Sequence, residues 1–254
     1  MPITDATQRF SSRVEHYARY RPGYPPEVIE LLKAECGLTG QFLIADIACG
    51  TGIFTRMLLE TGGRVFAVEP NEKMRRAAEE FLAGYSQFIS MNGTAEVTTL
   101  PDHSVELITA AQAAHWFDPA KARREFIRIL KPSGWLALIW NDRRIDASQF
   151  SREYENLLLR YATDYHEVRR LGGDVTARTL FGSSEFQSRV FDNCQEFDYT
   201  GLTGRLLSSS YTPQLGNPSY EPMLRELRRI FDAHQLNGRV IFDYDTQLYY
   251  GRIT

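Results

Sequence analysis

Short apolar runs alternate with amphipathic stretches through the first 145 residues. The runs that predict buried strands are 42–47, 64–68, 87–91, 105–110 and 135–140. Apolar residues recurring every three or four positions, with capping and stop signals, predict helices at 53–61, 71–83 and 118–130. Strands that alternate with helices at this spacing indicate βαβ units and a parallel sheet with helices on both faces.

The two ends of the chain follow other patterns. Helices are predicted at 8–20 and 26–36, separated by a turn-rich segment. From Phe150 to Val168, apolar and aromatic residues recur at helical spacing, which predicts one long amphipathic helix. The remaining predicted elements are a strand within 186–199, a polar loop at 208–220, a helix at 217–236 and an alternating strand at 239–251.

The predicted fold class is therefore α/β. We expect a Rossmann-like doubly wound sheet, mostly parallel with an antiparallel C-terminal edge strand, plus a helical cap. Three parts are predicted. They are an N-terminal helical lid at 1–39, a Rossmann-like domain at 40–145 and 185–254, and a helical cap insertion at 146–184.

Composition narrows the class of protein. A net charge of -3 over 254 residues disfavours a protein that binds nucleic acid, because such proteins usually carry a basic face. No apolar run approaches the roughly 18 residues of a membrane helix, and the first residues do not resemble a secretion signal. Three widely spaced cysteines fit neither a disulfide framework nor a metal site. We expect a cytoplasmic protein that binds no membrane and no metal.

The most informative segment joins the first predicted strand to the helix that follows. Asp46 ends the strand, and Gly50 and Gly52 lie in a short loop where the backbone can approach a ligand closely. A dinucleotide-binding loop needs a third glycine where Thr55 stands, and an aspartate before the loop would repel a pyrophosphate. The aspartate suits an ammonium group, and Glu69, at the end of the second strand, suits ribose hydroxyls. The cofactor that has adenosine, an ammonium-bearing amino-acid tail and no phosphate is S-adenosylmethionine.

The loop sequence D-x-A-x-G-x-G resembles the first motif of the class I S-adenosylmethionine-dependent methyltransferases, which usually have glycine where Ala48 stands. Further segments resemble that family in order: Glu69, Thr94–Glu96 with Leu100–Pro101, Ala111–Gln112 and Leu130–Gly134. The resemblance implies these cofactor-binding residues: Tyr17, Arg21, Asp46, Ala48, Gly50, Thr51, Gly52, Glu69, Pro70, Met74, Ala95, Glu96, Ala111 and Gln112.

Three other segments point within that family to the methyltransferase type 11 group, and to its branch that includes trans-aconitate methyltransferases. They are Tyr17 with Arg21–Pro25, the run Ala114–Phe117 and the tail Tyr244–Gly251. The implied activity is direct methyl transfer to a small-molecule acceptor, with an organic acid carboxylate preferred. An NAD(P)-dependent oxidoreductase on the same type of scaffold and a non-catalytic cofactor-binding module are the alternatives. The expected assembly is a monomer or homodimer.

The acceptor side is predicted from residues near the carboxyl ends of the strands. The residues expected to bind substrate are Tyr24, Trp116, Arg143 and Tyr161. A carboxylate acceptor needs a cationic clamp, for which Arg21, Arg143 and Arg144 are candidates. A phenol, amine or carbon acid would need a base, and His115 is then the candidate catalytic residue, because an ordinary histidine pKa lies near ~6.5.

Overall fold

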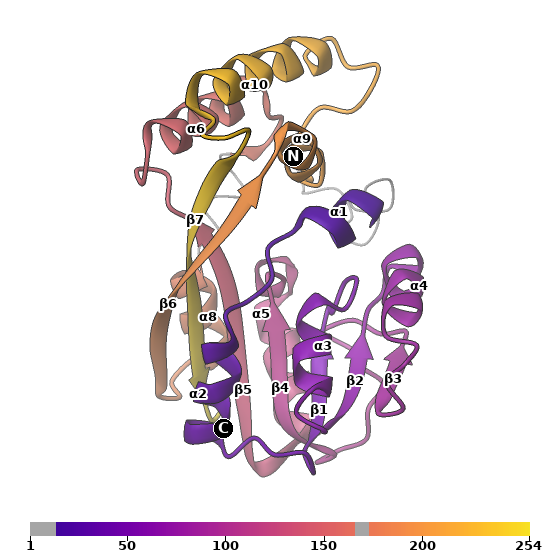
Figure 1. The fold of residues 1–254 in the computed structure, drawn as a ribbon. Helices are drawn as coiled ribbons and strands as arrows, with labels where there is room; N and C mark the ends of the chain where they lie inside the picture. The colour runs from indigo at the N-terminus through magenta and orange to yellow at the C-terminus, as the bar shows by residue number, and fades with distance from the viewer. Residues whose placement is uncertain (1–13, 166–172) are drawn as a thin grey trace.

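The computed structural model describes residues 14–165 and 173–254. Within these residues, strands form one seven-stranded sheet in the order β3-β2-β1-β4-β5-β7-β6 (Figure 1). The strands are β1 (Leu43–Ile47), β2 (Arg64–Val68), β3 (Phe88–Met91), β4 (Val105–Ala111), β5 (Leu130–Arg143), β6 (Phe186–Phe197) and β7 (Val240–Gly251). The first five pair in parallel, whereas β7 is antiparallel to both β5 and β6. The predicted fold class is confirmed.

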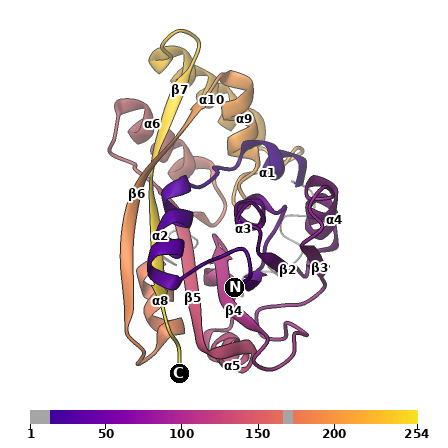
Figure 2. The ribbon, with the colours of Figure 1, turned by 60° about the horizontal axis from the view of Figure 1, so that its bottom comes forward.

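Helices cover both faces of the sheet. On one face, α2 (Pro26–Cys36) and α3 (Ile53–Leu59) pack against the side chains of Ile44, Val65 and Leu107. On the other face, α5 (Pro119–Ile129) and α8 (Gly173–Phe181) share a cluster with Ile47 and neighbouring strand residues. Figure 2 shows α2 and α5 on different sides of the sheet. Strand residues of opposite parity face opposite helical layers, which is the arrangement of a doubly wound sheet.

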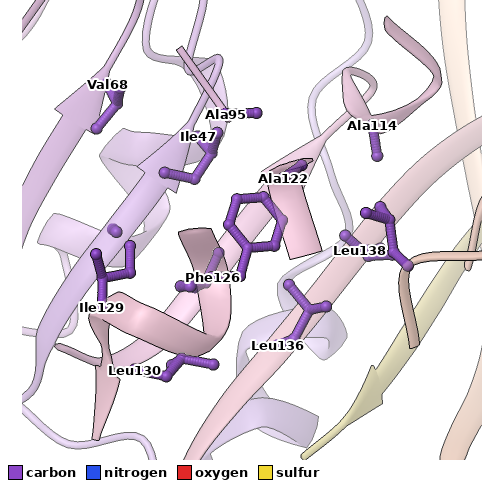
Figure 3. Close-up of a cluster of buried hydrophobic side chains, with 14 of the residues drawn as sticks. Ile47, Val68, Ala95, Ala114, Ala122, Phe126, Ile129, Leu130, Leu136 and Leu138 are labelled. Atoms are coloured by element: carbon purple, nitrogen blue, oxygen red, sulfur yellow. The ribbon is translucent and has the colours of Figure 1, made fainter. Parts of the chain in front are cut away.

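The cluster under α5 anchors the middle of the sheet. Phe126 is fully buried at its centre, between Ile129 of the same helix and Leu136 and Leu138 of β5 (Figure 3). Asp118 caps this helix by accepting a hydrogen bond from the Lys121 amide at 3.1 Å. Burial of a phenylalanine side chain contributes about 1.5–3 kcal/mol, so this packing fixes β4 and β5 firmly.

A second helical group lies at one end of the long strands. Helices α6 (Gln149–Tyr161), α9 (Tyr199–Leu207) and α10 (Tyr220–His234) gather around the far ends of β6 and β7 (Figure 1). Their own apolar cluster includes Tyr154, Phe242 and Leu227. The helix α1 (Val14–Tyr20) packs chiefly on α9 and also reaches α4 (Glu72–Phe81). This helical group faces the carboxyl ends of the parallel strands.

Glycine permits the close packing of α1 on α9. A Cβ atom placed on Gly204 would lie 2.1 Å from Cε2 of the Tyr20 ring. The Tyr20 ring therefore occupies the space that a side chain at position 204 would take. Arg205 follows Gly204 in α9, and Arg21 follows Tyr20, so this contact is next in sequence to two arginines.

Three sequence predictions are wrong in detail. The C-terminal strand is antiparallel but not at the edge, because β7 lies between β5 and β6. Its alternating pattern reflects a half-open face and not a free edge. The predicted long helix from Phe150 ends at Tyr161, where Ala162 adopts an extended conformation. The strand predicted at 135–140 is longer at both ends, because β5 already begins at Leu130, beside a register shift of β4 between Val105 and Leu107.

Other predictions are confirmed within a few residues. The helices begin at the expected caps, and Asn71 accepts a hydrogen bond from the Met74 amide at 3.1 Å. Helices α8 and α9 are additions that the sequence pattern did not predict. The part of the predicted first helix before Val14 lies outside the described residues. No helix among the described residues has the length and apolar character needed to cross a membrane.

Candidate functional site

The loop between β1 and α3 has an unusual backbone. Ala48, Gly50 and Gly52 have φ values of 53°, 60° and 84°, all in the left-handed region. Glycine adopts this region freely, but an alanine there costs roughly 1–2 kcal/mol. The strain at Ala48 explains why the resembled motif usually has glycine at this position. A Cβ on Gly52 would also lie 2.7 Å from Leu82 Cδ1, so a side chain there would add a close contact to the backbone strain.

Asp46 lies beneath this loop and is almost completely buried. Its Oδ2 accepts a hydrogen bond from Thr55 Oγ1 at 2.6 Å, and its Oδ1 accepts one from Thr109 Oγ1 at 2.7 Å. A carboxylate has about four lone-pair sites, so two sites stay available for a ligand. Burial raises the pKa of Asp46 to about 6, although the two threonine hydrogen bonds oppose the shift. A cationic ligand would stabilise the ionised form.

Glu69 connects the same loop to the end of β2. Its Oε2 accepts a hydrogen bond from the Gly50 amide at 2.9 Å, and its Oε1 accepts one from the Asn71 amide at 2.9 Å. Burial raises the pKa of Glu69, and these two amides oppose that shift. The carboxylate is therefore held in one orientation with lone pairs still available.

Two cavities adjoin the loop, and they share Tyr17, Ala48, Ala111, Gln112 and Trp116 as walls. The first, which we call the loop cavity, has a volume of about 150 Å³. It is lined by the shared residues and by Gly50, Glu69, Pro70, Asn71, Met74, Thr94, Ala95, Glu96, Ala113 and Phe117.

The second, which we call the central cavity, has a volume of about 420 Å³ and extends toward the helical group of α6, α9 and α10. Predicted residues that line it, besides the shared walls, are Arg21, Tyr24, Asp46, Thr51, His115 and Arg143. Residues that the sequence did not indicate include Trp140, Asn141, Asp142, Arg205, Tyr211 and Tyr244. Gly52 and Tyr161 line neither cavity, and Tyr161 packs against the α6–α10 cluster instead.

Arg143 is largely neutralised within the protein. Its Nη2 forms a buried ion pair with Glu155 Oε2 at 2.5 Å and also donates to Tyr165 Oη at 3.2 Å. Its guanidinium lies over the Tyr154 ring, 4.6 Å from the centroid. Arg144, the neighbouring clamp candidate, instead bridges Asp192 and Asp245 away from the central cavity. The structure therefore does not bring Arg144 together with Arg21 and Arg143, because the two aspartates hold its side chain outside the cavity.

Arg21 and Arg205 are the other two cations of the central cavity. Arg21 donates through Nη2 to the carbonyl oxygen of Ser208, at the C-terminal end of α9, at 3.0 Å. Its guanidinium lies 4.8 Å from the centroid of the Tyr17 ring. Arg205 is buried in α9 and donates through Nη1 to Ser209 Oγ at 3.1 Å. Burial lowers the pKa of Arg21, and the charge of Arg205 lowers it further.

Unsatisfied donors concentrate in the central cavity. Six buried side-chain nitrogen or oxygen atoms among the described residues have no hydrogen-bond partner, and five of them belong to residues that line this cavity. These five are Arg21 Nε, Thr51 Oγ1, Trp140 Nε1, Arg143 Nε and Arg205 Nε. Native proteins rarely leave buried donors unpaired, so the concentration indicates a ligand rich in acceptor atoms.

His115 lies in the short helix η1 (Ala114–Trp116), with its ring 4.7 Å from that of Trp116. Gln112 has a φ of 56° and donates through Nε2 to the Asn141 carbonyl oxygen at 2.9 Å. Strained backbone of this kind is often found at functional sites.

The described residues contain no group of three or more histidine, cysteine, aspartate or glutamate residues that could hold a metal ion.

Residues 45–138 match the sequence model of the family described as "Methyltransferase domain", Methyltransf_11. An uncharacterized methyltransferase of Mycobacterium tuberculosis is 40% identical over 139 residues, which cover 55% of this chain and 54% of that protein. An uncharacterized methyltransferase of Schizosaccharomyces pombe is 32% identical over 135 residues, covering 53% of each chain. The chain thus spans about half the length of the curated relatives that it matches.

Solved structures with the same fold cover nearly the whole chain. A proposed type II methyltransferase from Anaeromyxobacter dehalogenans has a TM-score of 0.65 at 21% identity, covering 92% of this chain and 98% of that one. A proposed methyltransferase of an antibiotic biosynthesis pathway from Anabaena variabilis has a TM-score of 0.61 at 22% identity, covering 93% and 100%. At these identities the likeness shows the fold alone.

S-adenosylmethionine is the cofactor that a methyltransferase domain implies, and the residues present fit it. The buried Thr51 hydroxyl has no partner. Asp46 and Glu69 offer carboxylate lone pairs at the carboxyl ends of adjacent strands, matched to an ammonium group and to ribose hydroxyls. The Met74, Ala95 and Phe117 side chains give the loop cavity an apolar lining suited to a nucleobase.

Proposed function

We propose that this chain is an S-adenosylmethionine-dependent methyltransferase that acts on a small organic acid. One observation carries the acceptor class. The central cavity, which adjoins the glycine loop, is lined by three arginines and holds five buried donors without partners. Such a cavity suits a carboxylate, because guanidinium groups bind carboxylates through paired hydrogen bonds.

The loop cavity and the adjoining part of the central cavity are proposed to hold the cofactor. Glu69 would accept hydrogen bonds from the ribose, and Asp46 would bind the ammonium group of the amino-acid tail. Met74, Pro70 and Ala95 would contact the adenine ring. When bound, S-adenosylmethionine supplies a methyl group on a sulfonium centre, which an acceptor atom attacks while the sulfur keeps the bonding pair.

The other residues of the central cavity are proposed to position the acceptor and exclude water. Tyr24 and Trp116 wall the cavity between the loop and η1, and Tyr17 covers both cavities. Catalysis of this kind depends mainly on holding the two reactants in line within a dry site. A carboxylate acceptor already carries its lone pair, so His115 has no proton to remove and acts as a wall of the cavity.

Several finer predictions from the sequence stay with this proposal. They are the trans-aconitate methyltransferase-like branch, a cytoplasmic location, a monomer or homodimer, and the division into a lid at 1–39, a cofactor domain and a cap at 146–184. The packing of α1 over both cavities supports a covering role for the N-terminal part.

The test is methyl transfer from labelled S-adenosylmethionine to a panel of small acids, phenols and amines. We expect esters of one or more acids and no transfer to neutral phenols. The variant His115→Gln should retain transfer to acids. Preferential transfer to phenols that His115→Gln abolishes would contradict an acid acceptor. It would show that the acceptor is a phenol and that His115 is its base.

A further inference from the structure

The three arginines of the central cavity are not equivalent. Arg143 has a carboxylate partner, Glu155, within the protein. Arg21 donates to the C-terminal end of α9, where the helix dipole offers partial negative charge. Arg205 has neither. No carboxylate among the described residues forms an ion pair with it, and its side-chain hydrogen bonds join it to the neutral hydroxyls of Ser209 and Tyr244.

Arg205 is also deeply buried, with 9% of its surface exposed and its Nε without a hydrogen-bond partner. A buried guanidinium is unfavourable unless an anion accompanies it. The carboxylates that line the same cavity do not meet this need. Asp46 accepts hydrogen bonds from Thr55 and Thr109, and Asp142 forms no ion pair with Arg205.

The neighbours of Arg205 strengthen the case for a bound anion. The charge of Arg205 acts against that of Arg21, so the two cations repel each other in the ligand-free protein. Tyr154, Tyr211 and Tyr244 surround the guanidinium, and Tyr211 and Tyr244 also line the cavity. An anion between the two arginines would remove the repulsion and accept the free Nε–H donors.

We propose that Arg205 is a specificity-determining residue that binds an anionic group of the methyl acceptor. This inference rests on the proposed function and assigns the acceptor's charge to one residue. Arg143 then stabilises the wall of the cavity through its ion pair with Glu155. Arg21 lies beside Tyr17, which borders both cavities.

A carboxylate could reach Arg205 from two sources, the amino-acid tail of the cofactor or the acceptor. The acceptor is favoured because Arg205 lies with Tyr211 and Tyr244 on the side of the central cavity that the α6–α10 group forms, whereas Asp46, the proposed partner of the tail's ammonium group, lies in β1. S-adenosylhomocysteine carries the same tail as the cofactor and no acceptor. It therefore separates the two sources in a binding experiment.

The experiment measures binding without turnover. Wild type, Arg205→Met, Arg205→Lys and the control Arg144→Met are titrated with S-adenosylhomocysteine. Each complex is then melted with and without glutarate, tricarballylate, butyrate, or dimethyl glutarate as the uncharged probe. Arg144 is chosen as the control because it is also an arginine in an ion-pair network but lies outside the cavity.

We expect at least one acid, and not dimethyl glutarate, to raise the melting temperature of wild type and Arg144→Met by several degrees. Arg205→Met should lose that shift, Arg205→Lys should keep part of it, and all variants should bind S-adenosylhomocysteine within about threefold of wild type. If Arg205→Met does not fold, Arg205→Lys is used in its place. An acid-induced rise in the melting temperature of Arg205→Lys that equals the wild-type rise then overturns the inference.

Other outcomes overturn the inference in distinct ways. A retained acid shift in Arg205→Met, or no acid shift in any protein, shows that Arg205 binds no acceptor anion. Loss of S-adenosylhomocysteine affinity of tenfold or more in Arg205→Met assigns Arg205 to the cofactor tail. Absence of S-adenosylhomocysteine binding to wild type instead contradicts the proposed function itself.

Discussion

The Gly50 amide donates a hydrogen bond to Glu69 Oε2 at 2.9 Å, joining the loop after β1 to the end of β2. The Asn71 amide donates to the other oxygen of the same carboxylate. This pair of contacts orients Glu69 toward the loop cavity before any ligand binds. The glycine loop and the acid thus form one preorganised unit.

The first prediction concerns this unit. The variant Glu69→Gln places an amide NH₂ against one of the two backbone donors, which should cost about 1–3 kcal/mol. We expect S-adenosylhomocysteine to bind at least about tenfold more weakly, since 1.4 kcal/mol is a factor of ten. Titration calorimetry measures the change. Glu72→Gln, an exposed position paired with Arg76, is the control and should leave the affinity unchanged; equal effects of the two variants would refute a ribose role for Glu69.

The second prediction is a pH dependence that arises from Asp46. Its folded pKa of about 6 lies above the unfolded value of 3.8, so the native state favours the protonated carboxyl. Stability from this group is therefore greatest at low pH and is lost as the pH rises through about 6. Compared with Asp46→Asn, the free energy of unfolding of wild type should fall by about 2 kcal/mol from about pH 4 to about pH 7. Urea unfolding of both proteins at both pH values measures this change. An equal pH dependence of the free energy of unfolding in wild type and Asp46→Asn would contradict a raised pKa of Asp46.

Cofactor binding should show the opposite dependence on pH. An ammonium group pairs with ionised Asp46, so the affinity for S-adenosylhomocysteine should fall as the pH drops below about 6. Glu69, whose pKa burial also raises, contributes to the same trend. Asp46→Asn should bind weakly at every pH and lose part of this dependence.

The third prediction tests the contact between Tyr20 and Gly204. A methyl group at position 204 would overlap the Tyr20 ring, so Gly204→Ala should displace α1 from α9. We expect faster amide hydrogen exchange in residues 14–20, by about tenfold or more, and weaker acceptor binding because Arg21 loses its place beside Ser208. The double variant Tyr20→Ala with Gly204→Ala relieves the overlap. Unchanged exchange in Gly204→Ala would show that α1 does not depend on this contact.

The fourth prediction compares two buried arginines by stability. Arg143→Met leaves Glu155 without its cation, and breaking a buried pair in this way costs about 3–5 kcal/mol. Arg205→Met removes a cation that has no carboxylate partner, so the ligand-free protein should be unchanged in stability or stabilised by about 1 kcal/mol. Urea unfolding of wild type and both variants measures these two changes in the free energy of unfolding. A loss in Arg205→Met as large as that in Arg143→Met would mean that Arg205 is held for the fold.

The sequence was sufficient for the parts of the fold that follow local rules. Asp46, Gly50 and Glu69 were predicted together because strand ends, glycine loops and acids have fixed places in a wound sheet. Arg205 was missed because α9 contains Gly201 and Gly204, which weaken a helical pattern. Gly204 is explained only by the Tyr20 ring, a partner 184 positions earlier. The pairing of β6 with β7, which moves β7 from the edge, is likewise a long-range choice that an alternating pattern does not specify.

The most direct measurement of the central claim is a calorimetric titration of the full chain with S-adenosylhomocysteine, with NADH in a parallel cell. We expect binding of one equivalent of S-adenosylhomocysteine, loss of that binding in Asp46→Ala, and no binding of NADH. Absence of S-adenosylhomocysteine binding at high protein concentration, or saturable binding of NADH in its place, would contradict the proposed function.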